Sequence, residues 1–205
     1  MGGATVRYLY LVRHGEALPD ESGLSEVGRR QASLLGRRLA GRPITAVHHG
    51  PLARAAQTAG LIAEHLPAVS VQACDAAGDY VPYVPGRAEL PSDGADHFLR
   101  FLAQAEPHAS GPELARQAVA SFTGPVAGDQ ERHELVVTHN FLIAWLVRHA
   151  LDAPAWRWLG LNHGHASLTV IRYAPGRPAS PLVVNDLGHL PEDLRWTGFP
   201  PGYRV

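Results

Sequence analysis

Two side chains suited to phosphoryl chemistry stand next to each other near the start of the chain. Arg13 and His14 occur within residues 11–16, LVRHGE, directly after the apolar run at residues 8–12. An imidazole can act as a nucleophile, and a guanidinium binds oxyanions through a rigid fork of N–H donors. The pair therefore predicts attack on a phosphoryl group, with His14 as nucleophile and Arg13 as anion clamp.

Three further predicted strands also end in polar side chains. Residues 48–50 read His-His-Gly with Arg54 in the next helix, Asp75 follows the third strand, and His139 follows the strand at residues 134–137. Parallel strands with right-handed crossovers place their carboxyl ends at one edge of a sheet, where helix N-termini favour anions. We therefore expect four side chains around one phosphate group: Arg13, His14, Arg54 and His139.

Alternating strands and helices must bring these strand ends together. Strands are expected at residues 7–12, 43–47, 69–73, 134–137, 166–173 and 182–185. Helices are expected at residues 25–41, 51–66, 94–105, 112–122 and 141–150. The pattern predicts an α/β fold, a three-layer α/β/α sandwich with a mostly parallel central sheet.

One domain is expected over residues 1–205, because this length suits a single domain and no repeat or linker interrupts the pattern. Two irregular segments interrupt the regular elements. A loop insertion at residues 76–96 is rich in Pro and Gly, and an irregular tail begins at residue 191. Long ordered loops often form lids or pocket walls, so the insertion is expected to set substrate choice.

The composition excludes several classes of function. The net charge of −1 gives no basic field for nucleic acid, and all 18 basic residues are Arg, which excludes lysine chemistry. The single Cys74 excludes an intrachain disulfide, and no recognised metal-ligand spacing occurs. We expect no metal and no cofactor. Without a stretch of signal-peptide or membrane length, we expect a cytoplasmic protein that does not bind membranes.

Four segments, in this order, resemble the histidine phosphatase superfamily, which is also called phosphoglycerate-mutase-like: LVRHGEA, LSEVGRRQA, PLARAAQTA and VVTHN. The resemblance covers about residues 7–190. It implies the phosphoglycerate-mutase-like fold and an in-line attack by His14 that forms a phosphohistidine, which water then hydrolyses without a metal. It also implies that Arg13, Arg54 and His139 bind the phosphoryl oxygens. A backbone carbonyl should hold the second ring nitrogen of His14.

The general acid that protonates the leaving oxygen is expected near the end of the third strand. Members of the family use a Glu or Asp at this place. Asp75 fits the position and is the preferred candidate, while Asp79 in Gly78-Asp79-Tyr80 is a close competitor.

Four other residues are candidates for substrate binding. Arg87 in the insertion offers an extra anion contact, and Tyr80 is placed to shape substrate choice. Glu16 lies in the first motif, although we expect it to accept a hydrogen bond from an Arg or a loop N–H rather than to take part in the reaction. Asp20 stands where many relatives carry an Asn that contacts phosphate. Because a carboxylate repels a dianion, we expect Asp20 to turn away, to pair with an Arg or to be protonated, which weakens a mutase assignment.

Several histidine and tryptophan residues are expected to play lesser roles. His48 and His49 lie close to the predicted pocket, and His163 and His165 could line its rim or lie in an exposed loop. Structural positions in the core or at an interface are expected for three tryptophans: Trp145, Trp156 and Trp158.

The sequence therefore predicts a metal-independent phosphatase that hydrolyses a phosphomonoester, with a small phosphorylated metabolite as its partner. A phosphomutase is the alternative, and a non-catalytic protein that binds phosphorylated ligands is a weaker one. A sugar phosphate, a nucleotide-derived intermediate, a cobalamin-pathway phosphate and a phosphohistidine protein all remain open as substrates. The oligomeric state is also open, with a homodimer as one option.

Overall fold

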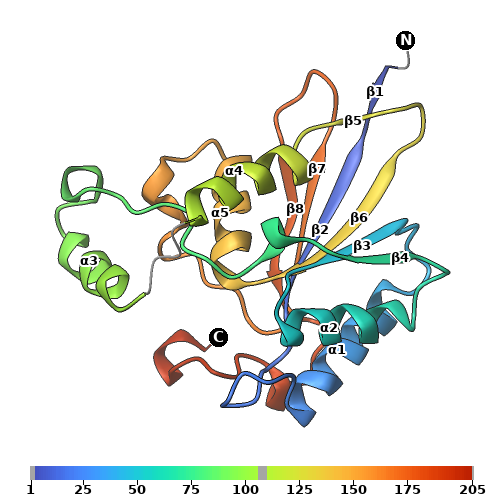
Figure 1. Cartoon of the computed structure of the whole chain (residues 1–205), viewed down its shortest axis with the longest axis horizontal. Coiled ribbons are helices and arrows are strands. Elements are labelled where there is room, and N and C mark those ends of the chain that lie inside the picture. The colour runs from blue at the N-terminus through green and yellow to red at the C-terminus, as the bar shows by residue number, and fades with distance from the viewer. Residues whose placement is uncertain (1–2, 106–109, 205) are drawn as a thin grey trace.

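The computed structural model describes residues 3–105 and 110–204. A six-stranded sheet crosses the molecule, with helices on both of its faces (Figure 1). Its strands are β2 (Arg7–Arg13), β3 (Ala46–His49), β4 (Ser70–Ala73), β6 (Arg132–Thr138), β7 (Leu168–Tyr173) and β8 (Ser180–Asp186). The helices are α1 (Glu26–Leu39), α2 (Ala53–Ala63), α3 (Ala95–Gln104), α4 (Gly111–Phe122) and α5 (Asn140–Ala150).

The strand order in the sheet is β4-β3-β6-β2-β7-β8. The first four strands run parallel, and β7 is antiparallel to both of its neighbours, β2 and β8. A separate two-stranded sheet pairs β1 (Ala4–Thr5) with β5 (Val126–Ala127). The expected α/β sandwich with a mostly parallel sheet is confirmed, and the carboxyl ends of β2, β3, β4 and β6 meet at one edge.

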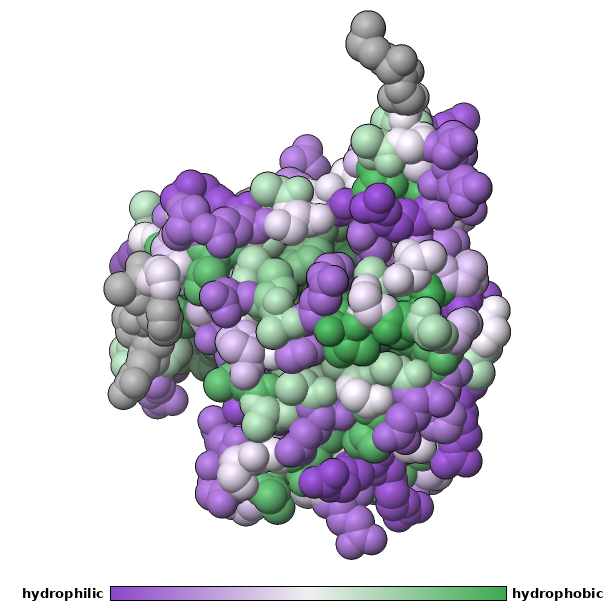
Figure 2. All heavy atoms as spheres, turned by 45° about the vertical axis from the view of Figure 1, so that its right-hand side comes forward, coloured by the Kyte–Doolittle hydropathy of each residue, from purple (hydrophilic) through white to green (hydrophobic). Residues whose placement is uncertain are grey.

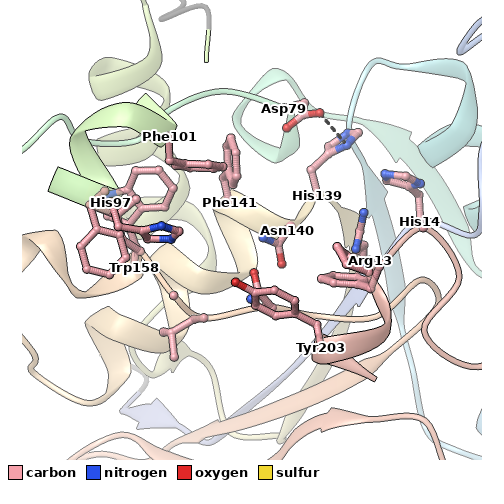
Figure 3. A pocket seen from close by; sticks show the side chains of 18 residues that line it. Arg13, His14, Asp79, His97, Phe101, His139, Asn140, Phe141, Trp158 and Tyr203 are labelled. Atoms are coloured by element: carbon pink, nitrogen blue, oxygen red, sulfur yellow. Dashed lines mark ion pairs between the residues drawn. The ribbon is translucent and has the colours of Figure 1, made fainter. Parts of the chain in front are cut away.

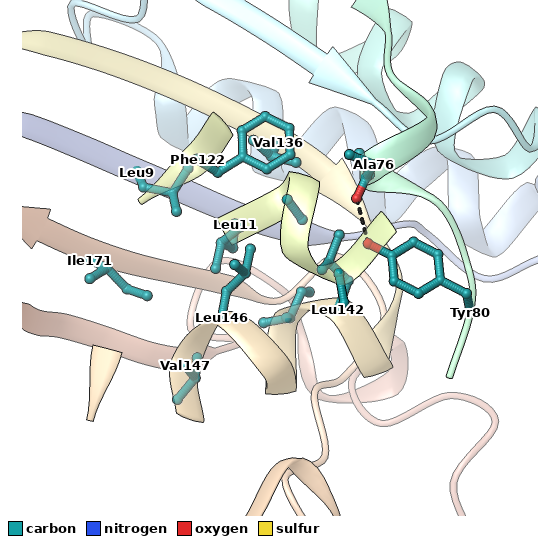
Figure 4. Packing of buried hydrophobic residues seen from close by; sticks show 14 of the residues in the cluster. Leu9, Leu11, Ala76, Tyr80, Phe122, Val136, Leu142, Leu146, Val147 and Ile171 are labelled. Atoms are coloured by element: carbon teal, nitrogen blue, oxygen red, sulfur yellow. Dashed lines mark hydrogen bonds between the residues drawn. The ribbon is translucent and has the colours of Figure 1, made fainter. Parts of the chain in front are cut away.

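Strand β2 separates two hydrophobic cores, because its successive side chains point to opposite faces of the sheet. Leu9 and Leu11 pack with α4 and α5 (Figure 4). Tyr10 and Val12 pack with α1 and α2 on the other face. Burial on both faces explains why the strand reads as a continuous apolar run rather than as alternating apolar and polar residues. It also holds the carboxyl end of β2 rigidly in the middle of the sheet.

The expected element boundaries need small corrections. The second strand begins at Ala46 rather than at residue 43, and the second helix runs from Ala53 to Ala63 rather than over residues 51–66. Strand β7 begins at Leu168 because Ala166, with φ of 53°, lies in a turn. The insertion contains only two short 3₁₀ turns, Asp75–Ala77 and Arg87–Glu89.

The molecular surface mixes hydrophilic and hydrophobic residues on the face seen in Figure 2. Large exposed apolar side chains such as Leu52, Val71 and Leu182 belong to three different parts of the chain, and scattered residues of this kind need no partner. Within the described residues, no helix is long and apolar enough to cross a membrane.

Two glycines let the loop after β2 lie directly against the first turn of α1. A Cβ on Gly28 would lie 2.1 Å from the carbonyl oxygen of Glu16, and a Cβ on Gly15 would lie 2.5 Å from the carbonyl oxygen of Gly28. The Ser25 backbone N–H also donates to the Glu16 carbonyl at 3.0 Å, and the Ser25 hydroxyl caps α1 by accepting from the Gly28 N–H. The loop that carries His14 is therefore fixed against a helix terminus.

This close contact predicts opposite effects of the same substitution at two helical glycines. Gly28→Ala should reduce the free energy of unfolding by about 1–3 kcal/mol through steric overlap, although Ala favours a helix. Gly60→Ala in α2 should increase it by about 0.5–1 kcal/mol, because a Cβ there meets nothing within 4 Å. Urea unfolding of both variants measures the difference. A stabilised Gly28→Ala variant would contradict the close approach.

Candidate active site

The predicted four-residue cluster lies at the carboxyl edge of the parallel strands. Arg13 ends β2 and His14 follows it, Arg54 lies in the first turn of α2, and His139 is the N-cap of α5. The ring centres of His14 and His139 are 4.9 Å apart. Arg13, His14 and His139 line a cavity of about 690 Å³ (Figure 3), and Arg54 donates to Asp79, which also lines it.

The His14 ring is held in one tautomer. Its Nδ1 lies 2.7 Å from the carbonyl oxygen of Gly15, which can only accept a hydrogen bond, so Nδ1 carries the proton. The side chain is 6% exposed, and burial, followed by the nearby His139 and Arg13, lowers its pKa to about 2. His14 is therefore neutral at physiological pH, with an unprotonated Nε2 that has the lone pair a nucleophile needs.

Arg13 is fixed by a backbone acceptor at the side of the cavity. Its Nη1 donates to the carbonyl oxygen of His163 at 2.6 Å, and its guanidinium lies 5.3 Å from the ring centre of Phe199. Burial lowers the pKa of Arg13 to about 10, which leaves the side chain cationic at neutral pH. The remaining N–H groups can therefore bind an oxyanion in the cavity.

Arg54 is buried and is held by two carboxylates. Its Nη2 donates to Asp79 at 2.8 Å and its Nη1 to Glu21 at 3.2 Å. The Thr58 hydroxyl donates to the Arg54 carbonyl at 2.7 Å and accepts from the Gly15 N–H at 3.0 Å. This hydroxyl therefore links the start of α2 to the loop that follows His14.

His139 presents unused ring nitrogens to the cavity. Neither nitrogen forms a hydrogen bond with the described residues, although Nδ1 lies 3.3 Å from a carboxylate oxygen of Asp79. Burial, followed by Arg54 and Arg13, lowers the pKa of His139 to about 3. The neutral ring stands at the N-terminus of α5, where helix N–H groups favour an anion, and can donate one hydrogen bond to a phosphoryl oxygen.

The preference for Asp75 over Asp79 is corrected by the chain path after β4. Asp75 begins a 3₁₀ turn, is exposed and does not line the cavity. The turn reverses the chain, and Gly78 permits it because a Cβ there would lie 2.9 Å from the carbonyl oxygen of Asp75. The turn thereby returns Asp79 to the cavity, beside Arg54 and His139.

Two of the predicted substrate ligands point away from the cavity, which corrects their assignment. Asp20 is exposed and accepts hydrogen bonds from the backbone N–H and the hydroxyl of Ser22 at 3.1 and 2.8 Å. These bonds lower the pKa of Asp20, which favours the ionised carboxylate. Of the three behaviours expected for Asp20, the structure therefore agrees with the first, in which the side chain turns away from the phosphate. Arg87 is exposed and pairs with Asp96 at 2.6 Å.

Two other predicted ligands have structural contacts instead. Tyr80 is buried in the core, where its hydroxyl donates to the Ala76 carbonyl at 2.7 Å. Glu16 accepts from the Ser25 hydroxyl at 2.8 Å and so supports the start of α1. Neither residue is among those that line the cavity, so the structure gives them structural contacts in place of the expected substrate contacts.

Three of the histidines singled out from the sequence lie near the site without lining the cavity. His165 is buried, its ring centre is 5.4 Å from that of His14, and its Nδ1 is 2.9 Å from the Thr197 hydroxyl. His163 is also buried, and its ring does not line the cavity. His49 donates from Nδ1 to its neighbouring carbonyl. Among the described residues, no group of His, Cys, Asp and Glu side chains could hold a metal ion.

Sequence reasoning missed one half of the cavity, which we call the aromatic wall. It comes from α3, α5, the 3₁₀ turn Ala155–Trp158 and the C-terminal tail. Its members are Phe98, Phe101, Phe141, Trp158, Phe199 and Tyr203. The spacing of two Phe residues along α3 was the available signal. Only the tertiary fold brings α3 and the tail to the site, and the predicted insertion lines the cavity only through Asp79.

Comparison with known proteins identifies the family. The model of the histidine phosphatase superfamily (branch 1) matches residues 9–186. The chain belongs to this superfamily. The match spans all four residues of the predicted cluster.

Curated relatives of this chain are named as phosphatases. It is 31% identical over 193 residues to the mitochondrial serine/threonine-protein phosphatase Pgam5 of Caenorhabditis elegans, covering 90% of this chain and 64% of that protein. It is 26% identical over 206 residues to human PGAM5, covering 91% and 65%. The chain thus spans about two thirds of the length of these relatives. Their names support phosphatase activity.

Solved structures of the superfamily share the fold. A mycobacterial glucosyl-3-phosphoglycerate phosphatase is 25% identical with a TM-score of 0.59, covering 88% of this chain and 99% of that one. The phosphoglycerate mutase of Plasmodium falciparum is 19% identical with a TM-score of 0.62, covering 91% and 95%. The second likeness shows the fold alone.

The contact between Glu21 and Arg54 predicts tighter phosphate binding when the Glu21 side chain is made neutral. Glu21→Gln removes an exposed carboxylate that competes for the guanidinium. The inhibition constant of inorganic phosphate should fall about two- to fivefold, the range expected of an exposed ion pair. Glu64→Gln, at the other end of α2, is the matched control and should change nothing. An unchanged or higher inhibition constant for Glu21→Gln would refute the competition.

Proposed function

We propose that this protein is a metal-independent phosphatase that hydrolyses a phosphomonoester through a phosphohistidine on His14. The observation that carries the proposal is the hydrogen bond from Nδ1 to the Gly15 carbonyl, which leaves a neutral Nε2 free within the electrostatic influence of Arg13 and Arg54. A nucleophile and charge-neutralising donors in fixed positions are what phosphoryl transfer requires.

In the first step, Nε2 of His14 attacks phosphorus in line with the leaving oxygen. An N–P bond forms while the P–O bond to the alcohol breaks. Arg13 and Arg54 bind the equatorial oxygens and neutralise their charge, and His139 donates to one of them. Asp79 gives a proton to the leaving alkoxide, so that the alcohol departs neutral.

In the second step, water attacks the phosphohistidine. Asp79, now ionised, takes a proton from the water, while the new P–O bond forms and the N–P bond breaks. Inorganic phosphate leaves, and His14 returns to its neutral state. The donors that stabilised the first transition state also serve the second.

A small phosphorylated metabolite is the first candidate substrate. The phosphate-binding side chains lie at one end of a cavity of about 690 Å³, a size suited to a small ligand. A phosphoserine or phosphothreonine protein is the second candidate, favoured by the names of the relatives. The phosphomutase alternative requires transfer between hydroxyls of one substrate and a bisphosphate primer, whereas the phosphatase releases inorganic phosphate.

The nucleophile is tested with p-nitrophenyl phosphate in the presence of EDTA. The wild type should release phosphate, and His14→Ala should lose activity by about a thousandfold or more. His49→Ala is a matched control, because His49 also follows a strand and also donates from Nδ1 to the next carbonyl, at 2.8 Å, but lies outside the cavity. An acid-labile phosphoenzyme should form in the wild type only. Loss of wild-type activity in EDTA, or survival of activity in His14→Ala, would exclude the proposal.

The general acid is tested by the dependence of rate on the leaving group. Asp79→Asn should slow hydrolysis of an alkyl phosphate by about a hundredfold or more, because an alkoxide needs protonation. Hydrolysis of p-nitrophenyl phosphate should slow far less, because nitrophenolate leaves unprotonated. Asp75→Asn should leave both rates unchanged. Equal slowing of both substrates by Asp79→Asn would show that Asp79 acts through Arg54 rather than as an acid.

A further inference from the structure

The cavity has two chemically different ends. Arg13, His14, His139 and Asp79 gather at one side of Figure 3. Phe101, Phe141 and Trp158 lie toward the other side with His97, and Tyr203 lies between the two groups. A phosphate group bound at His14 would direct its alcohol part along the aromatic wall.

The aromatic wall is packed and preformed. The Trp158 indole N–H donates to the Tyr83 carbonyl at 3.0 Å, and Trp158 is 2% exposed. Phe141 packs edge-on against Trp158 with ring centres 5.2 Å apart, and Phe101 packs edge-on against Phe141 at 5.8 Å. These contacts fix the rings without a ligand, so little ordering opposes binding of an apolar group.

A second anionic group on the substrate would find no guanidinium at this end. Among the described residues that line the cavity, Arg13 alone has a guanidinium, and it belongs to the phosphate end. The imidazole of His97 is the one basic group drawn beside the aromatic rings. Arg157 is turned onto the Trp156 ring and donates to the Leu159 carbonyl. Burial of an unpaired charge is strongly unfavourable, whereas burial of an apolar group against aromatic rings is favourable.

We infer that the substrate is a phosphomonoester of a flat, apolar alcohol that carries no second anionic group. This inference rests on the proposed phosphatase function and specifies its substrate class. The phosphoryl group binds at His14, and the apolar part binds on the aromatic wall. Phosphorylated carboxylic acids are then poor substrates.

Three synthetic esters test the inference because they share the same alkyl leaving oxygen. They are ethyl phosphate, 3-phenylpropyl phosphate and 3-(4-carboxyphenyl)propyl phosphate. For the wild type, kcat/KM for the phenylpropyl ester should exceed that for the ethyl ester about tenfold or more, and should exceed that for the carboxyphenyl ester about tenfold or more. Differences in leaving-group acidity do not enter these comparisons.

Variants at Phe101 test whether the aromatic wall causes the preference for the phenylpropyl ester. Phe101 is 39% exposed on α3, so it can be changed without opening a core. Phe101→Ala should reduce the ratio of kcat/KM values for the phenylpropyl and ethyl esters several-fold. Phe101→Arg should supply a cation and raise kcat/KM for the carboxyphenyl ester relative to the phenylpropyl ester. Leu182→Ala, at a similarly exposed apolar position on β8, is the control and should preserve both ratios.

The outcomes separate the two proposals. Equal kcat/KM for all three esters, or faster hydrolysis of the carboxyphenyl ester, overturns the substrate class and leaves the phosphatase mechanism intact. Faster hydrolysis of a phosphoserine peptide than of the phenylpropyl ester overturns the inferred substrate class in favour of a protein substrate. Absence of phosphate release from every ester, the peptide and p-nitrophenyl phosphate overturns the proposed function itself. The wild-type comparison decides these points even where a variant fails to fold.

Discussion

The hydrogen bond between His14 Nδ1 and the Gly15 carbonyl is the interaction on which the rest of the site depends. It selects the tautomer and fixes the ring plane, but it holds only if the following loop stays in place. Gly15 and Gly28 allow that loop to touch α1, and the Thr58 hydroxyl ties it to α2. The two helices are in turn anchored on the face of the sheet formed by Tyr10 and Val12. Core packing therefore determines, through this loop, that the proton of the His14 ring lies on Nδ1.

Electrostatics at the site follow from burial next to two cations. Arg13 and Arg54 disfavour any further positive charge, and burial disfavours it more, so His14 and His139 are both neutral. Glu21 and Asp79 compensate part of the positive charge through Arg54. Both carboxylates pair with Arg54, whereas Arg13 donates to the backbone carbonyl of His163. The site is thus complementary to an anion mainly through Arg13, and the neutral ring of His139 can add one N–H donor.

The four-residue cluster could be predicted because each member lies at the carboxyl end of a strand or at the start of a helix. Arg13, His14 and His139 end strongly apolar strands, and the parallel topology then fixes their common edge. Asp79 could not be separated from Asp75, because a 3₁₀ turn of three residues decides which carboxylate returns to the cavity. The aromatic wall was beyond prediction, since α3 and the tail meet there through tertiary packing. Arg87 was predicted to contact the substrate, but it forms an ion pair with Asp96, which is close to it in the sequence.

The two ends of the cavity differ in how freely they can change during evolution. The chemical end is built from strand termini in the middle of a sheet that is covered on both faces, where most substitutions would disturb a core. The aromatic wall is built largely from α3 and the tail, which contribute no strand to that sheet. Insertions, deletions and substitutions in these two segments can therefore reshape the substrate pocket while the reaction machinery is inherited intact. Such a division lets one chemistry diverge toward many substrates within a single fold.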